Sequence, residues 1–410
     1  MSEPRKDFVQ PPEQAAETGT LAARISLSQR AGGIAVPVAT VILAFLVGGL
    51  VVLATGHNPL NAYHDIFNGA GLNWIFHPTI STQGAAAYNL SQTLLQATTL
   101  ILTGLAVAFA FRCGMFNIGG QGQYFVGLVV ANWIGVSFAG MSTLPHVLIA
   151  IVGATLAGAA WAGIAGLLKA TTGAHEVIST IMLNYIALYT ASWLFGAGGP
   201  LQTSAPGQQT NPVSAPVAHT AQLPVIWGTK GFQGLDIGFL IAIAALVVYW
   251  ALINRTTLGY EVRAVGFNPD AAAYGGINVK KNLIRAMAIS GAFAGLAGAV
   301  DMLGYLYQYG QLDVQVSQVG FIGIAVALLG RNTAVGVFLG SIVFGGLIYG
   351  TTQGLSSNVI QPELAGNLTA IIVGLVVLFV GADLLILYVW NSRTRLRPGR
   401  SGRAPAKATA

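Results

Sequence analysis

Long apolar runs are the feature that most constrains how this chain can fold. A helix needs about 20 apolar residues to cross the roughly 30 Å hydrocarbon core of a bilayer. We identify about ten candidate windows by hydropathy, at residues 34–54, 91–111, 124–140, 146–169, 177–196, 237–253, 283–303, 320–330, 334–350 and 368–390. Hydrophobic residues make up 54% of the 410 and charged residues only 8%, which excludes an ordinary soluble domain. The sequence therefore predicts an all-α polytopic membrane protein with about ten transmembrane helices.

Two of these runs are weak candidates for a complete span. The run at 124–140 is marginal, and the run at 320–330 is short. Both follow polar entries of similar pattern, QGQYFVGLVVAN at 121–132 and SQVGFIGIAVALLGRN at 317–332. Short helices in matching positions of two repeats are a pointer to a transport site. We therefore expect two related halves, with a broken or short third helix and a broken or short eighth helix.

The positions of Lys and Arg predict the orientation of the chain, because loops rich in these residues stay in the cytoplasm. With a cytoplasmic N-terminus and an even number of spans, all 19 of them except Lys230 fall on the cytoplasmic side. We expect both termini inside, with residues 1–33 as a cytoplasmic segment, 34–390 as the membrane domain and 391–410 as a basic tail. A tail of this kind faces anionic lipid, so the net charge of +6 requires no nucleic-acid partner.

A polar, glycine-rich segment separates the second apolar run from the third. It reads RCGMFNIGGQGQYF, residues 112–125, and holds an arginine, an asparagine, two glutamines and four glycines. Irregular backbone is tolerated at membrane depth only where protein or a water-filled cavity surrounds it. Polar side chains at that depth are natural candidates for a pathway. We expect a broken helix packed inside the bundle, and predict six pathway residues: Phe116, Asn117, Gln121, Gln123, Tyr124 and, in the fifth run, Asn184.

The loop at 256–282 carries the local signals of a short helix. Asn268 is a good N-cap, Pro269 suits the first helical position, and Asp270 favours the positive end of a helix. Two glycines at 275–276 then end the helix. The sequence predicts a compact helix lying across the membrane surface. The alternative is a charged loop that only fixes the topology.

Three segments resemble those of a known family. The sequence GYEVRAVGFNPDAAAYGGINV at 259–279, followed by AISGAFAGLAGAV at 288–300, resembles the coupling region of ABC importer permeases of the branched-chain amino acid and simple-sugar type. The segment GMFNIGGQGQ at 114–123 is similar to the other hallmark of that group. The segment HEVISTIMLNYIA at 175–187 looks like the subset that imports nucleosides with basic-membrane-lipoprotein binding proteins. In many relatives a glutamate stands at the position of Gln121.

The resemblance implies a type II-like permease, in a bacterial cytoplasmic membrane, that forms half of a translocation pathway and is not itself an enzyme. In agreement, the sequence contains no G-x-x-x-x-G-K-[ST] phosphate loop. The implied partners are a second permease subunit, identical or different, two ATP-binding subunits that carry ATP and Mg, and an extracytoplasmic substrate-binding lipoprotein. The residues implied to couple to the ATPase are Gly259, Glu261, Arg263, Gly266, Asn268, Pro269, Ala272 and Gly276.

The resemblance favours a nucleoside as the transported substrate. Amide side chains would bind its base edge and ribose hydroxyls, and Phe116 or Tyr124 would stack on the base. Alternatively, the amides bond only to neighbouring helices. The loop at 199–234 would pack over the outer mouth, where ligand is handed over.

Two other transporters stay open as alternatives, a ribose-like sugar permease and an ion-coupled secondary transporter. Ion coupling usually needs titratable residues at depth, and the few candidates, Glu176, Asp301 and Asp383, lie near predicted span ends. No His or Cys cluster with metal-ligand spacing and no nucleophile–base arrangement suggests an enzyme.

Overall fold

Helices make up most of the structure, a computed structural model that describes residues 38–76 apart from 40 and 55, 85–203, 212–228, 234–355 and a few positions between 367 and 378. A small antiparallel sheet pairs β1 (Val225–Trp227) with β2 (Leu235–Asp236). The segments predicted at 1–33 and 391–410, and most of the tenth apolar run, lie outside the described residues.

The α-helices are α2 (Pro59–Gly69), α3 (Ala85–Arg112), α4 (Gly120–Ser137), α5 (Thr143–Thr172), α6 (Glu176–Phe195), α7 (Gly238–Arg255), α8 (Thr257–Phe267), α9 (Pro269–Tyr274), α10 (Val279–Asp301), α11 (Gln311–Val316), α12 (Val319–Leu329) and α13 (Ala334–Gly350). Short 3₁₀ turns lie at η1 (Leu72–Ile75) and η2 (His219–Ala221). Two π-helical turns, η3 (Met302–Leu306) and η4 (Thr351–Leu355), extend α10 and α13.

Seven helical segments in the described part of the chain are long and apolar enough to cross a membrane, or eight if a bent pair counts as one span. The bent pair joins a helix at Val41–Ala54 to α2 at an angle of 117°. α4 is not among the seven, since Gln121, Gln123 and Asn132 lower the hydropathy of its 18 residues. α12 has only 11 residues, and it counts among the seven only together with α11, over Gln311–Leu329. The predictions of a polytopic all-α membrane protein and of a weak third and a short eighth helix are confirmed.

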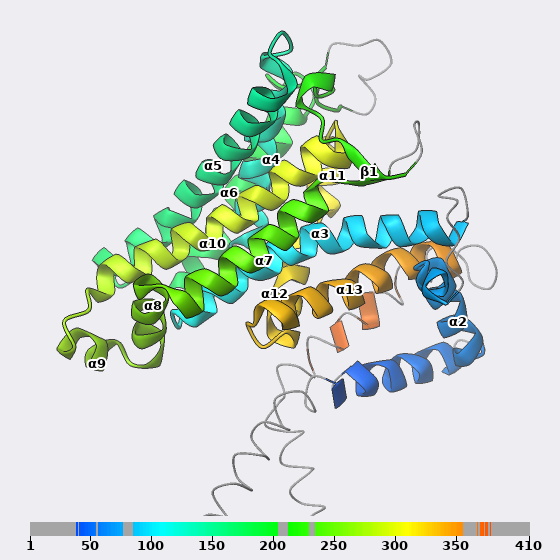
Figure 1. Ribbon diagram of the computed structural model, residues 1–410, viewed down its shortest axis with the longest axis horizontal. Coiled ribbons are helices and arrows are strands. Elements are labelled where there is room, and N and C mark those ends of the chain that lie inside the picture. Colours follow the sequence, from blue (N-terminus) through cyan, green and yellow to red (C-terminus); the bar gives the residue numbers. More distant parts are fainter. Residues whose placement is uncertain are drawn as a thin grey trace, which may run out of the picture.

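Small residues allow α10 to pack closely against its neighbours along the bundle (Figure 1). A Cβ atom on Gly291 would lie 2.2 Å from the carbonyl oxygen of Gly158 in α5. A Cβ atom on Gly298 would lie 2.3 Å from the carbonyl oxygen of Tyr124 in α4. Such close backbone approach is how membrane helices commonly associate. It brings the 288–300 motif directly against α4.

The two ends of the bundle carry different structures. Figure 1 shows α8 and α9 at one end, and β1 with α11 at the other. At the β1 end, the described residues of the 199–234 loop bond to the chain after α10. The N–H groups of Ser214, Val217 and Leu223 donate to the carbonyl oxygens of Tyr309, Tyr307 and Leu303 at 2.9, 2.9 and 2.8 Å. This part of the loop is therefore bonded onto the end of the bundle.

Candidate functional site

The chain breaks between α3 and α4. α3 ends at Arg112, and α4 begins only at Gly120. Gly114 has a φ of +73°, in the left-handed region that glycine adopts most readily. Within the break, Asn117 Oδ1 accepts a hydrogen bond from the Gly119 N–H at 2.9 Å. This is the interruption that the polar segment predicted.

A closed network of amides fills the break. Asn117 is fully buried, and its Nδ2 donates to Gln123 Oε1 at 2.9 Å and to Ser290 Oγ in α10 at 2.7 Å. Gln123 Nε2 donates back to Asn117 Oδ1 at 3.0 Å. Ser290 Oγ donates in turn to the carbonyl oxygen of Ala106 in α3. The network therefore joins the break to two neighbouring helices, and the two hallmark motifs meet at Asn117 and Ser290.

Asn184, on α6, caps the start of α4. The first turn of a helix has N–H groups without intrahelical partners, and the N-cap residue Gly119 provides no side-chain bond. Asn184 Oδ1 accepts from the Gly122 N–H at 2.8 Å, while its Nδ2 donates to the carbonyl oxygen of Ile118 at 2.9 Å. A side chain at position 122 would crowd α6, because a Cβ atom there would lie 2.9 Å from Asn184 Oδ1 and 3.0 Å from Asn184 Cα.

Gln121 caps a different helix. Its Oε1 accepts from the Gly320 N–H of α12 at 2.6 Å, and its Nε2 donates to the carbonyl oxygen of Ser317 at 3.1 Å. Gln121 thus connects α4 with α12, the two short helices of the predicted halves. The polar entries that look alike in the sequence are in direct contact.

The two predicted aromatic residues have different surroundings. Tyr124 is 1% exposed, and its hydroxyl donates to Asp301 Oδ2 at 2.8 Å. The Thr99 hydroxyl, Oγ1, donates to Oδ1, the other oxygen of the Asp301 carboxyl group. Phe116 is half-buried and packs on Phe111 with ring centroids 5.0 Å apart. Both carboxylate oxygens therefore have a hydroxyl donor, at the point where α10 passes into the π turn η3.

The sequence interpretation missed several members of this site. Asp301 was considered only as a residue near a span end, although an acid at the close of the 283–303 run was the available signal. It is the last residue of α10, and its side chain is buried inside the bundle. Ser290 and Ser317 lie in two of the segments quoted above, but, like Thr99, neither was singled out, because single hydroxyls are common in membrane helices. Within the described residues, no group of three His, Cys, Asp or Glu side chains could hold a metal ion.

The predicted short helix in the 256–282 loop is present as α9. Asn268 Oδ1 accepts from the Ala271 N–H at 3.0 Å, Pro269 is the first helical residue, and Gly276 follows with a φ of +81°. It is preceded by α8, which Thr256 caps through the Gly259 N–H at 3.1 Å. The predicted N-cap at Asn268 and the predicted end of the helix at the two glycines are therefore confirmed.

The eight predicted coupling residues divide into two groups. Gly259 and Ala272 are buried, and Glu261 accepts from Asn282 Nδ2 at 2.9 Å. Gly266 packs against α3, where a Cβ atom on it would lie 2.3 Å from the Arg112 carbonyl oxygen. Arg263 is half-buried and donates to its own helix. The exposed members are Asn268, Pro269 and Gly276. Much of the motif therefore packs α8 and α9 onto the membrane domain and onto the broken segment.

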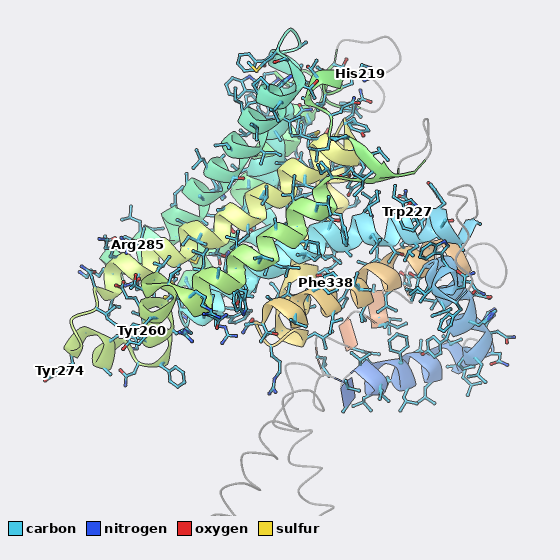
Figure 2. All side chains as sticks on the ribbon, in the orientation of Figure 1. His219, Trp227, Tyr260, Tyr274, Arg285 and Phe338 are labelled. Atoms are coloured by element: carbon cyan, nitrogen blue, oxygen red, sulfur yellow. The ribbon has the colours of Figure 1, made fainter. Side chains whose placement is uncertain are left out.

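Three aromatic side chains that we did not predict project from this end. Phe267 is 95% exposed, Tyr274 97% and Tyr260 64%. Figure 2 shows Tyr260 and Tyr274 at the same end of the molecule as Arg285, with His219 at the opposite end. Exposed aromatic groups at the tips of two packed helices are typical of a protein-binding surface.

Comparison with known proteins agrees with this architecture. Residues 89–381 match the model of the family described as the branched-chain amino acid transport system permease component. The chain belongs to this family. The guanosine ABC transporter permease protein NupP of Bacillus subtilis is 37% identical over 361 residues, which cover 88% of this chain and 97% of that protein.

Two further relatives cover most of this permease. The nucleoside ABC transporter permease protein NupB of Lactococcus lactis is 35% identical over 82% of this chain and 89% of its own length. The glucose ABC transporter permease protein TsgB13 of Haloferax volcanii is 33% identical over 84% of this chain and 86% of its own length. No solved structure matches the chain significantly. The protein is therefore a multi-pass transporter permease and not an enzyme.

Proposed function

We propose that this permease carries nucleosides inward as part of an ATP-driven importer. The observation that carries the proposal is the similarity over most of the chain to permeases named for guanosine and for nucleosides. The third sequence motif, which supplies Asn184, supports the same substrate. A substrate-binding lipoprotein on the outside delivers the nucleoside, and the described part of the 199–234 loop offers it an ordered surface.

Sugar transport is the second candidate, favoured by the similarity to a permease named for glucose. Ion-coupled transport has less support. Asp301 is a buried carboxylate of the kind that such coupling uses, but Thr99 and Tyr124 already donate to both of its oxygens. A carboxylate held in this way is suited to fixing the π turn.

ATP hydrolysis, with its Mg, belongs to two separate ATP-binding subunits that dock on α8 and α9. Tyr260, Phe267 and Tyr274 supply the apolar contact area of that surface. Gly266 packs against the carbonyl group of Arg112, so a displacement of α8 by the ATP-binding subunits would be transmitted directly to the broken segment between α3 and α4. The side of the bundle that bears α8 and α9 is then cytoplasmic. In this orientation residues 1–33 and 391–410 are cytoplasmic, and residues 34–390 form the membrane domain.

The outward face of α6 is our candidate for the pathway shared with a second permease subunit. Tyr185 and Tyr189 are 55% and 67% exposed in the middle of the span, and neither hydroxyl has a hydrogen bond within the described part of the chain. A hydroxyl facing lipid without a partner is unfavourable. Water between two subunits would satisfy these hydroxyls, and the rings would stack on a base. Phe116 and the amides then shape this path from behind α6.

The test is uptake by the complete complex reconstituted in vesicles with its binding protein and ATP-binding subunits. We expect saturable, ATP-dependent uptake of radiolabelled guanosine, adenosine or uridine. Ribose and glucose in about hundredfold excess should compete poorly, because each lacks the base. Better competition by a sugar than by any nucleoside would contradict the nucleoside proposal. Uptake that persisted without ATP would support ion coupling instead.

A further inference from the structure

The N-termini of α4 and α12 meet inside the bundle. A Cβ atom on Gly320 would lie 2.3 Å from the backbone nitrogen of Gln121. Each helix N-terminus carries a partial positive charge and N–H groups without intrahelical partners. Two such ends repel one another more strongly in an apolar interior than in water. An acceptor between them is therefore needed to hold them together.

Gln121 provides that acceptor, and its geometry uses both ends of the amide. Oε1 accepts from the Gly320 N–H at 2.6 Å, and Nε2 donates to Ser317 O at 3.1 Å and to Ser317 Oγ at 3.3 Å. The side chain is 2% exposed. The N-cap residue of α12, Gln318, makes no side-chain capping bond of its own. The start of α12 is thus capped from α4.

The same arrangement recurs on the other side of α4. Asn184 of α6 caps α4 through Gly122, as Gln121 of α4 caps α12 through Gly320. The caps form a series from α6 to α4 to α12. Because each cap belongs to a different helix from the one it serves, displacing α6 pulls on α4, and α4 pulls on α12.

We infer that Gln121 is a positioning residue that locks α4 and α12 into one joint between the two halves of the permease, with Asn184 holding the other side of that joint. The inference rests on the transport function proposed above. Gln121 acts through α12, and it does not contact the substrate. Its loss slows the conformational step that follows substrate delivery and leaves substrate recognition intact.

The central variant is Gln121→Met, which keeps the side-chain length but removes donor and acceptor. In the reconstituted complex we expect kcat for uptake to fall about tenfold or more while KM changes less than about twofold, the signature of a lost conformational step. Gln121→Glu retains an oxygen for the Gly320 N–H and should keep more of the rate. Ser317→Ala is the matched control, since of the Gln121 bonds it removes the longer one to Oγ and leaves the backbone acceptor.

Three outcomes would overturn the inference. The first is a wild-type uptake rate in Gln121→Met, and the second is a fall in kcat in Ser317→Ala as large as that in Gln121→Met. The third is a rise in KM at constant kcat in Gln121→Met, which would make Gln121 a substrate contact. If Gln121→Met fails to accumulate, Gln121→Asn provides the test, because its shorter amide cannot span the same contacts.

A thermal double-mutant cycle tests the joint without any substrate, and so separates its failure from failure of the nucleoside proposal. Gln121→Met and Asn184→Leu should lower the apparent Tm of the purified permease non-additively, because Asn184 caps the start of α4 and Gln121 bonds that same start of α4 to α12. Additive shifts would contradict a single joint.

Discussion

Asp236 is a buried carboxylate that has only half of its hydrogen bonds. Its Oδ1 accepts from the Gly238 N–H at 2.6 Å, whereas Oδ2 is buried and has no partner within the described residues. Burial raises the pKa of Asp236 to about 6, although the bond from Gly238 acts in the opposite direction. The carboxyl group lies outside the membrane-spanning helices, just before α7. Its charge therefore opposes folding.

Stability should therefore depend on pH through Asp236. In the folded protein it binds a proton more tightly than in the unfolded chain, so its contribution is fully favourable below about pH 4 and is lost as the pH rises through 6. We expect Asp236→Asn to be more stable than the wild type at pH 7.5, by up to about 3 kcal/mol. The advantage should shrink at pH 4. Thermal unfolding in detergent at both values tests this, with the exposed Asp270→Asn as control. An advantage that is equal at pH 4 and 7.5 would rule out the titration.

Cys113 illustrates the opposite consequence of burial. It is the only cysteine in the sequence, and its side chain is 2% exposed. Burial raises the pKa of its thiol to about 12. Since the thiolate is the reactive form, maleimide should not label the folded wild-type protein at pH 7.5, but should label it after denaturation. Rapid labelling of the native protein would contradict the buried position. An inert native thiol makes the chain a suitable background for introduced cysteines.

At the scale of the elements, α8 and α9 combine an inner and an outer surface. The inner surface, with Gly259 and Ala272, packs on the membrane domain, and the outer one carries Phe267 and Tyr274. The N-cap at Asn268 could be predicted because a cap and its helix are neighbours in sequence. The exposure of Phe267 could not be predicted, since an apolar residue in a short helix is as compatible with an inward position as with an outward one.

Removing the exposed aromatic groups should uncouple transport without unfolding the permease. We expect Phe267→Ser with Tyr274→Ser to lower ATP-dependent uptake by about tenfold, because buried aromatic anchors dominate protein interfaces. The variant should reach the membrane in normal amounts and copurify poorly with the ATP-binding subunits. Phe76→Ser is the control, as Phe76 is 71% exposed and belongs to the chain before α3. Full uptake by the double variant would exclude this surface as the docking site.

In the molecule as a whole, one carbonyl group connects helices that are remote in sequence. Arg112 ends α3 and donates to the Asn332 carbonyl oxygen through Nε at 3.1 Å and Nη2 at 2.7 Å. The hydroxyl of Tyr249 in α7 donates to the same oxygen at 2.7 Å. Asn332 lies in the turn between α12 and α13 and has a φ of +54°. Three donors thus converge on a turn whose backbone is unusual for a residue other than glycine.

Because Arg112 and Tyr249 share an acceptor, their substitutions should not be additive. Arg112→Met alone should cost about 1.5–3 kcal/mol, the range for hydrogen bonds from charged groups. With Tyr249→Phe added, the carbonyl loses all three donors, and the loss should exceed the sum of the single effects by roughly 1 kcal/mol. Unfolding in detergent measures the cycle. Arg255→Met is the control, since Arg255 stacks on Trp250 of its own helix. An additive result would contradict shared capping of Asn332.

The membrane-spanning class, the break after Arg112, the weak third and eighth helices and the capped helix at Asn268 could all be predicted from the order of the residues. Each depends on hydrophobic length or on signals within a few residues. The partners of the buried amides could not be predicted in this way, because they depend on how the helices pack. Asn184 bonds to a residue 62 positions away and Gln121 to one 199 positions away. A buried N–H takes whichever acceptor the packing brings near, and that packing is set by close glycine contacts between helices remote in sequence.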